Sequence, residues 1–123
     1  MRTAIPVNLS VDQGADLFVE FNLRDENSNY INLLGYTVTA KFSRSYQSVT
    51  PTYAFNAQVP VGNTAEGLVT LSLSGTTEDT VNNIPKTGDL KAGRYLYDVY
   101  LTSPVGDVDK YLEGILTVSP GVL

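Results

Sequence analysis

The sequence predicts an all-β protein: a single antiparallel β-sandwich of about seven or eight strands, in one domain that spans residues 1–123. Three observations predict this fold. Bulky and polar residues alternate with a period of two in several segments, as in strands with one buried and one solvated face. Turn signals rich in Gly, Pro, Asn and Asp separate these segments. No fixed-period repeat is visible, which argues against a propeller or a solenoid.

The composition supports one folded domain. Apolar residues make up 42% of the 123-residue chain and charged residues 17%, which is typical of a globular protein with a real core. A chain of this length can build one two-layer core but not a second. With no cysteine in the sequence, stability must come from packing rather than from disulfides.

The strands are expected in seven segments. The clearest alternation runs through "DLFVEFNLRD", "YTVTAKFSRS" and "GLVTLSLS", where every second residue is apolar. The segment "SRSYQSVTPTY" is polar and contains a proline, so we expect a long exposed loop there. In chain order, the expected strands cover residues 5–11, 16–25, 36–45, 52–59, 67–74, 93–103 and 108–118.

One segment departs from the alternation. In "GTTEDTVNNIP", Thr76 is followed three residues later by Asp79, which is the spacing of a capping box, and the pattern stops at Pro85. We therefore expect one short helical turn over residues 77–83, crossing the end of the sandwich.

Composition also limits the chemistry of the chain. It has no histidine and no cysteine, which removes the usual acid/base group and thiolate chemistry. The net charge of −5 opposes binding to nucleic acid, whose affinity depends on Lys and Arg. The N-terminal segment lacks the apolar stretch of a secretory signal, and no apolar run approaches the length that spans a bilayer. We expect a soluble protein made in a cytoplasm, with no membrane partner.

Acidic residues offer only weak candidates for a site. Asp25, Asn27 and Asn29 have the spacing that begins an EF-hand loop, but Tyr30 stands where glycine is required. Asp and Asn also favour turns, which is the preferred interpretation of this segment.

Three further carboxylates, Asp107, Asp109 and Glu113, could work as an acid/base pair only within a cleft. The alternation places Asp109 and Glu113 on the same face of a strand. No serine can have a histidine partner, and no phosphate-binding loop is present. We expect no catalytic residue, no cofactor, no metal and no small-molecule substrate.

Tyrosines are stronger candidates for a contact surface than the acidic residues, because four of the eight lie in the stretch from Gly93 to Val122. By alternation, Tyr95 and Tyr97 face the core, whereas Leu96, Asp98 and Tyr100 lie on the opposite face. That opposite face fits either plain packing within the sheet or a subunit interface, since tyrosine is enriched in interface cores. Tyr46 and Tyr53 are candidate exposed loop contacts, which would suit a carbohydrate ligand.

The order of motifs resembles a family of small virion proteins of tailed phages, cyanophages included. "VDQGADLFVEFNL" resembles an opening strand pair, and "AGRYLYDVYLTSPVGDVDKYLEGILTVSPGV" resembles a closing hairpin. The order Gly-Arg-Tyr, Tyr-Asp-Val, Glu-Gly and Thr-Val-Ser-Pro is its most specific part. The first half is also similar to the N-terminal domain of phage baseplate upper proteins. The resemblance covers nearly the full length.

The resemblance implies an immunoglobulin-like or jelly-roll-like sandwich that serves as a non-enzymatic building block of a virion. Its partners would be other virion proteins and copies of itself. The tail, as a baseplate, neck or fibre-attachment protein, is the leading position, and a capsid decoration protein is the alternative. A carbohydrate- or receptor-binding module is a further alternative.

Overall fold

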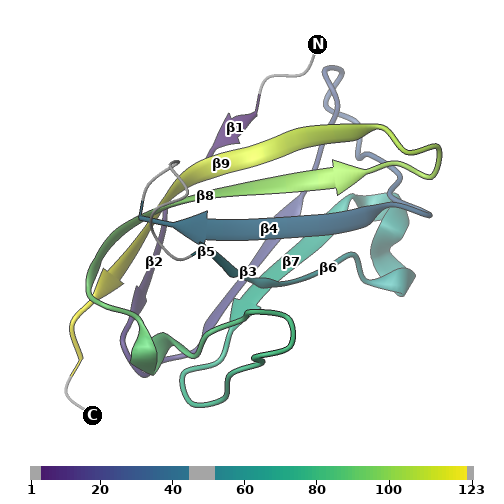
Figure 1. Cartoon of the computed structure of the whole chain (residues 1–123). Helices are drawn as coiled ribbons and strands as arrows, with labels where there is room; N and C mark the ends of the chain where they lie inside the picture. The colour runs from purple at the N-terminus through teal and green to yellow at the C-terminus, as the bar shows by residue number, and fades with distance from the viewer. Residues whose placement is uncertain (1–3, 45–51, 122–123) are drawn as a thin grey trace.

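The computed structural model describes residues 4–44 and 52–121, and within them the chain forms two packed β-sheets (Figure 1). The large sheet has the strand order β1-β9-β8-β4-β5, with β2 also paired to β9, and the small sheet has the order β3-β7-β6. This confirms the predicted all-β sandwich. The strands are β1 (Ile5–Pro6), β2 (Leu9–Asp12), β3 (Leu17–Asn22), β4 (Thr37–Ser43), β5 (Thr52–Ala54), β6 (Asn56–Gln58), β7 (Leu68–Leu73), β8 (Gly93–Thr102) and β9 (Val108–Ser119).

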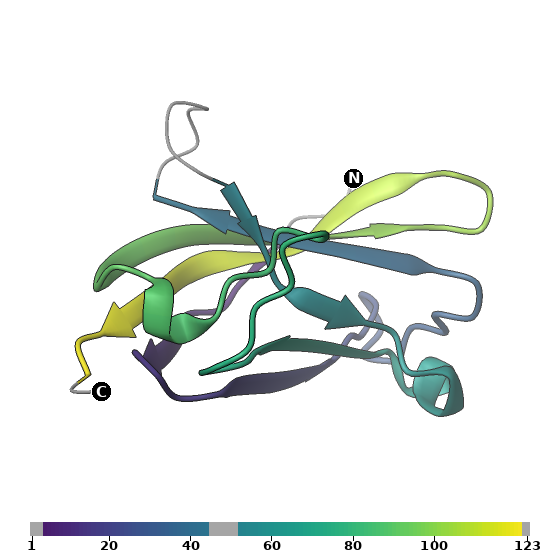
Figure 2. The same cartoon turned by 60° about the horizontal axis from the view of Figure 1, so that its bottom comes forward.

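The strand order is immunoglobulin-like. In immunoglobulin domains the second, fifth and fourth strands share one sheet, and the third, sixth and seventh share the other. Here β3-β7-β6 corresponds to the first group and β4-β8-β9 to the second, with β5 added beyond β4. Figure 2 shows the two sheets as separate layers. Of the two expected sandwich types, immunoglobulin-like and jelly-roll-like, this strand order matches the immunoglobulin-like one.

The sandwich is not antiparallel throughout, because β1 and β2 both run parallel to β9. The expected single strand over residues 5–11 is broken at Val7 and Asn8. The Val7 N–H donates to the Glu113 carbonyl (2.8 Å), and the Asn8 side chain accepts from the Ile115 N–H (3.2 Å). Gly114 lies opposite this break, where a Cβ atom would overlap the Val7 carbonyl. The parallel edge therefore depends on a glycine in β9.

The core lies between the sheets and includes an aromatic cluster. Phe42 contacts Phe55 (ring centroids 4.7 Å apart) and Tyr95 (5.6 Å), and Phe55 contacts Tyr97 (5.9 Å). Tyr95 and Tyr97 are 3% and 1% exposed, which confirms that these two tyrosines face the core.

Tyr95 also forms the tyrosine corner of immunoglobulin-like domains. Its hydroxyl donates to the carbonyl of Lys91, four residues upstream, over 2.8 Å. In antibody domains the second cysteine of the inter-sheet disulfide follows two residues after this tyrosine. Tyr97 occupies that position here, and its hydroxyl donates to the Val7 carbonyl over 2.5 Å. In this cysteine-free chain, a buried and hydrogen-bonded ring therefore stands at the position of that cysteine.

The expected helical turn over residues 77–83 is wrong. This segment forms an irregular loop closed by a bridge between Asp79 and Ile84. The Asp79 side chain accepts from the Asn82 N–H (3.2 Å) and side chain (2.7 Å), so it stabilises a turn rather than the start of a helix. Short 3₁₀ helices lie instead at η1 (Val61–Glu66) and η2 (Thr87–Asp89).

Thr87 fastens the end of the sandwich that carries η2. It is completely buried, and its hydroxyl donates to the Ala15 carbonyl (2.7 Å) and accepts from the Gly14 N–H (3.1 Å). Its own N–H donates to the Ser74 carbonyl (2.9 Å). One side chain therefore joins the β2–β3 turn to the loop between β7 and β8.

Candidate functional site

The predicted interface residues Leu96, Asp98 and Tyr100 lie on the outer face of the large sheet. Each is half-buried and alternates along β8 with fully buried core residues. The strand register places each of them between one residue of β4 and one of β9. The three rows across the sheet are Ser43-Leu96-Ile115, Lys41-Asp98-Glu113 and Thr39-Tyr100-Lys110.

Charges on this outer face are balanced and interacting. Lys110 Nζ lies 2.9 Å from Glu113 Oε1, and this hydrogen bond raises the pKa of Lys110. Burial raises the pKa of Asp98; Glu113 adds to this, while Lys110 and Lys41 oppose it. The face therefore combines a charged row with apolar and aromatic neighbours, which suits a contact with another protein.

The predictions for the two loop tyrosines, Tyr46 and Tyr53, have different outcomes. Tyr46 lies outside the described residues. Tyr53 belongs to β5 rather than to a loop, and its half-buried ring lies 5.4 Å from that of Phe42. The expectation of an exposed loop position is therefore wrong for Tyr53, because residues 52–54 pair with β4 and draw the ring onto the core.

The acidic candidates are not gathered into a reactive site. Asp25 accepts hydrogen bonds from the N–H groups of Asn27 (2.9 Å) and Asn29 (3.0 Å), which confirms the turn. A register shift at the Val99/Tyr100 step places Asp109 opposite the core residue Leu101 and Glu113 opposite Asp98. The two carboxylates thus occupy opposite faces, and the expectation of a shared face is wrong. In the described parts of the chain, no group of three or more acidic side chains could hold a metal ion.

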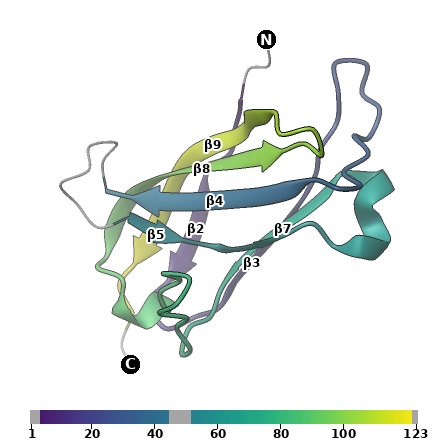
Figure 3. The ribbon, with the colours of Figure 1, turned by 45° about the vertical axis from the view of Figure 1, so that its right-hand side comes forward.

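Sequence reasoning missed a second surface, which three loops build at one end of the sandwich. We call it the loop end and define it as residues 23–36, 60–67 and 103–109, on the right of Figures 1 and 3. Hydrogen bonds join the first two segments, from the Leu23 N–H to the Gly67 carbonyl (2.8 Å) and from the Leu33 N–H to the Thr64 carbonyl (2.9 Å). Gly35 lies against Pro104, so the third segment joins them.

Exposed apolar side chains and negative charge both concentrate at the loop end. It holds five of the eight large apolar side chains that are exposed in the described residues: Tyr30, Leu34, Val61, Val105 and Val108. It also holds five acidic residues and one basic residue, leaving eight acidic and seven basic residues for the rest of the chain. Each segment taken alone looked like an ordinary turn; the charge distribution was the signal that could have identified the surface.

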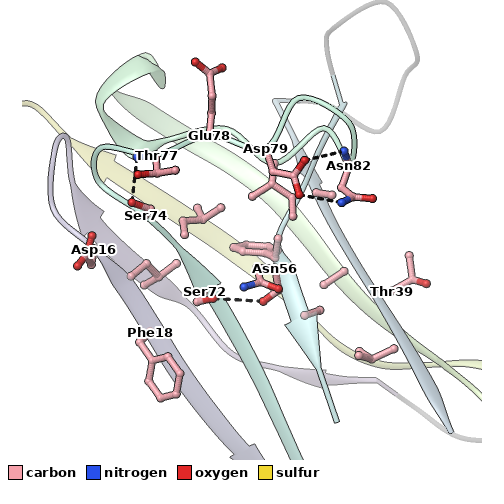
Figure 4. Close-up of a pocket in the computed structure, with 18 residues that line it drawn as sticks. Asp16, Phe18, Thr39, Asn56, Ser72, Ser74, Thr77, Glu78, Asp79 and Asn82 are labelled. Atoms are coloured by element: carbon pink, nitrogen blue, oxygen red, sulfur yellow. Dashed lines mark hydrogen bonds between the residues drawn. The ribbon is translucent and has the colours of Figure 1, made fainter. Parts of the chain in front are cut away.

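A depression of about 710 Å³ lies beside the loop after β7 (Figure 4). Strands β3, β4, β6 and β7 and the loop residues 74–84 line it. Some of its polar groups bond to one another: the Asn82 side chain donates to Asp79 (2.7 Å), which lowers the pKa of Asp79, and the Ser72 hydroxyl donates to the Asn56 carbonyl (3.4 Å).

Comparisons with known proteins give little about function. No family model and no curated protein matches the chain. Among solved structures, murine CRIg is similar over 95% of this chain and 94% of its own, with 14% sequence identity and a TM-score of 0.42. None of the helices in the described residues is long and apolar enough to cross a membrane. The strand order, rather than this likeness, therefore identifies the fold.

Proposed function

We propose that this chain is a non-enzymatic structural component of a bacteriophage virion that assembles through protein–protein contacts. Its partners are other virion proteins and copies of itself, and its leading position is the tail, as a baseplate, neck or fibre-attachment protein. The order of sequence motifs supports the assignment to a virion, and the immunoglobulin-like sandwich is compatible with it. Because such sandwiches serve many functions, the assignment to a virion is based on the sequence motifs rather than on the fold.

The outer face of the large sheet carries the proposal of an assembly role. Leu96, Ile115 and Tyr100 keep part of their surface exposed there, next to the charged row through Asp98. Desolvated charges and aromatic groups give an interface specificity, and many copies multiply weak contacts. An edge of either sheet could add strand pairing with a neighbour.

Substitution on this face tests the assembly role. Tyr100→Asp should prevent incorporation into particles while the isolated protein stays folded, because it places a new charge in the contact. Phe18→Asp is the matched control, since Phe18 is 63% exposed on the small sheet. Normal incorporation of the Tyr100 variant would remove this face from the interface.

The position in the particle requires a separate experiment. Electron microscopy of the parent virion, with the protein labelled at its C-terminus, should place the label on the tail. Labels arrayed on the capsid lattice would support the alternative, a capsid decoration protein.

A carbohydrate- or receptor-binding module is a second candidate, favoured by the surroundings of Tyr53. A hollow of about 220 Å³ is lined by Tyr53 together with polar groups that include Asp79 and Asn83. An aromatic ring beside carboxylate and amide groups suits a sugar. Binding on a glycan array that Tyr53→Ala abolishes, with the fold retained, would favour this module over the structural role.

A further inference from the structure

We propose that the loop end is a second protein-docking surface, whose partner is a protein segment that combines apolar side chains with Lys and Arg side chains. This goes beyond the proposed function, because it concerns a different surface and names the chemistry of the partner. This docking proposal does not depend on whether the protein belongs to a virion.

Three of the exposed apolar side chains of the loop end stand at turns or at the start of a 3₁₀ helix. Val61 begins η1, Val105 lies in the turn between β8 and β9, and Leu34 lies in the turn before β4. Their exposed fractions are 88%, 85% and 68%. Protruding apolar groups lose contact with water when a partner packs apolar side chains around them. The partner must therefore supply apolar side chains that surround these groups.

The surface is held in place before any partner binds. Besides the hydrogen bonds between the loops, Arg24 fastens the hairpin over residues 24–30. Its guanidinium lies 4.3 Å from the centroid of the Tyr30 ring and donates to the Ser28 carbonyl (3.1 Å). Gly67 has a φ of +64°, and a Cβ atom there would overlap the Leu23 carbonyl, so the loops meet closely. A preorganised surface loses less conformational entropy on binding.

Charge selects the class of partner. The loop end has a net charge of −4, and the rest of the chain has −1. The single basic residue, Arg24, is held against Tyr30. Nucleic acid and anionic membranes are negatively charged, and so is the loop end of a second copy, so like-charge repulsion disfavours all three. A basic protein surface is attracted. The carboxylates concerned are exposed, namely those of Asp25, Glu26, Glu66, Asp107 and Asp109.

Nuclear magnetic resonance of the full-length, isotope-labelled protein can test this with three synthetic peptides of equal length. One is built from Leu and Arg, one from Ser and Arg, and one from Leu and Glu. The Leu/Arg peptide should shift backbone signals of the loop end, and added salt should weaken its binding. The Ser/Arg and Leu/Glu peptides should bind at least about tenfold more weakly, because each lacks one of the two required features.

Two double variants distinguish specific binding at the loop end from nonspecific binding to exposed apolar side chains. Val61→Ser with Val105→Ser should reduce affinity for the Leu/Arg peptide about tenfold. The control, Phe18→Ser with Val81→Ser, removes two exposed apolar groups that lie elsewhere (63% and 91% exposed) and should leave affinity unchanged. Shifts mapped outside the loop end, equal binding of the Leu/Glu peptide, or no binding would each overturn the proposal. Concentration-dependent shifts without peptide would identify self-association instead. Virion incorporation of Tyr100→Asp is measured separately, so either proposal can fail alone.

Discussion

The Tyr97 hydroxyl, inside the core, donates a hydrogen bond to the Val7 carbonyl in the break between β1 and β2. The two residues are 90 positions apart, and the bond links β8 to the sheet edge that β1 and β2 form beside β9. It also supplies a partner for a carbonyl that the strand break would otherwise leave without one. Tyr97 therefore serves both as a core ring and as an anchor for the N-terminal strand.

Removing this hydroxyl should destabilise the protein. Tyr97→Phe keeps the ring but leaves the Val7 carbonyl without this donor, and the expected loss in free energy of unfolding is about 1–3 kcal/mol. Urea denaturation followed by circular dichroism measures it. Tyr30→Phe is the control. Tyr30 is 47% exposed, so removing its hydroxyl should change the free energy of unfolding far less. Equal effects in the two variants would contradict the anchoring role.

Burial raises the pKa of Tyr97 to about 12, which gives the stability a dependence on alkaline pH. Above its normal pKa of 10.0, the tyrosine ionises in the unfolded chain but stays protonated in the folded one. The folded state then binds more protons, so stability falls as pH rises from 10 to 12. The slope from this group approaches about 1.4 kcal/mol per pH unit. Stability curves of wild type and Tyr97→Phe should converge over this range; parallel curves would argue against the raised pKa.

Gly114 should be intolerant of even a methyl group. Gly114→Ala places a Cβ atom on the Val7 carbonyl and should separate β1 from β9 or force β9 to move. We expect a loss of about 1–3 kcal/mol, typical of overpacking. Gly62→Ala is the control, because no atom lies within 4 Å of a Cβ atom at that position. Thermal unfolding of both variants measures the difference, and similar transition temperatures would contradict it.

Period-two alternation predicted most of the sandwich, including the burial of Tyr95 and Tyr97. It could not predict the bulge that separates Asp109 from Glu113, since a bulge arises from pairing with β8 rather than from β9 alone. The break at Val7 likewise depends on Gly114, more than a hundred residues later. The helical turn was predicted from a capping pattern that also forms turns, and local sequence does not distinguish the two. The loop end depends on contacts between segments far apart in the chain.

Thr87 offers a test of the buried polar link at the opposite end. Thr87→Val preserves the shape but removes the hydroxyl that serves Gly14 and Ala15. The Gly14 N–H and the Ala15 carbonyl, which are only partly buried, then lose this partner, at an expected cost of about 1–3 kcal/mol. Thr87→Ser retains the hydroxyl and should lose less. Hydrogen exchange should show faster exchange of the Gly14 amide in the valine variant only; unchanged protection would mean that the backbone relaxes onto other partners.

Asp98 should limit the stability of the isolated protein. Burial raises its pKa in the folded state, so its ionised form is disfavoured there relative to the unfolded chain. Asp98→Asn should therefore increase the free energy of unfolding at neutral pH, and the gain should shrink as pH falls through the pKa values of the folded and unfolded states. Denaturation curves at neutral and acidic pH measure both effects. If the outer face is an interface, the same variant should also weaken assembly, because the row with Lys41 and Glu113 loses a charge. A variant that is more stable yet assembles normally would indicate that Asp98 contributes nothing to the contact.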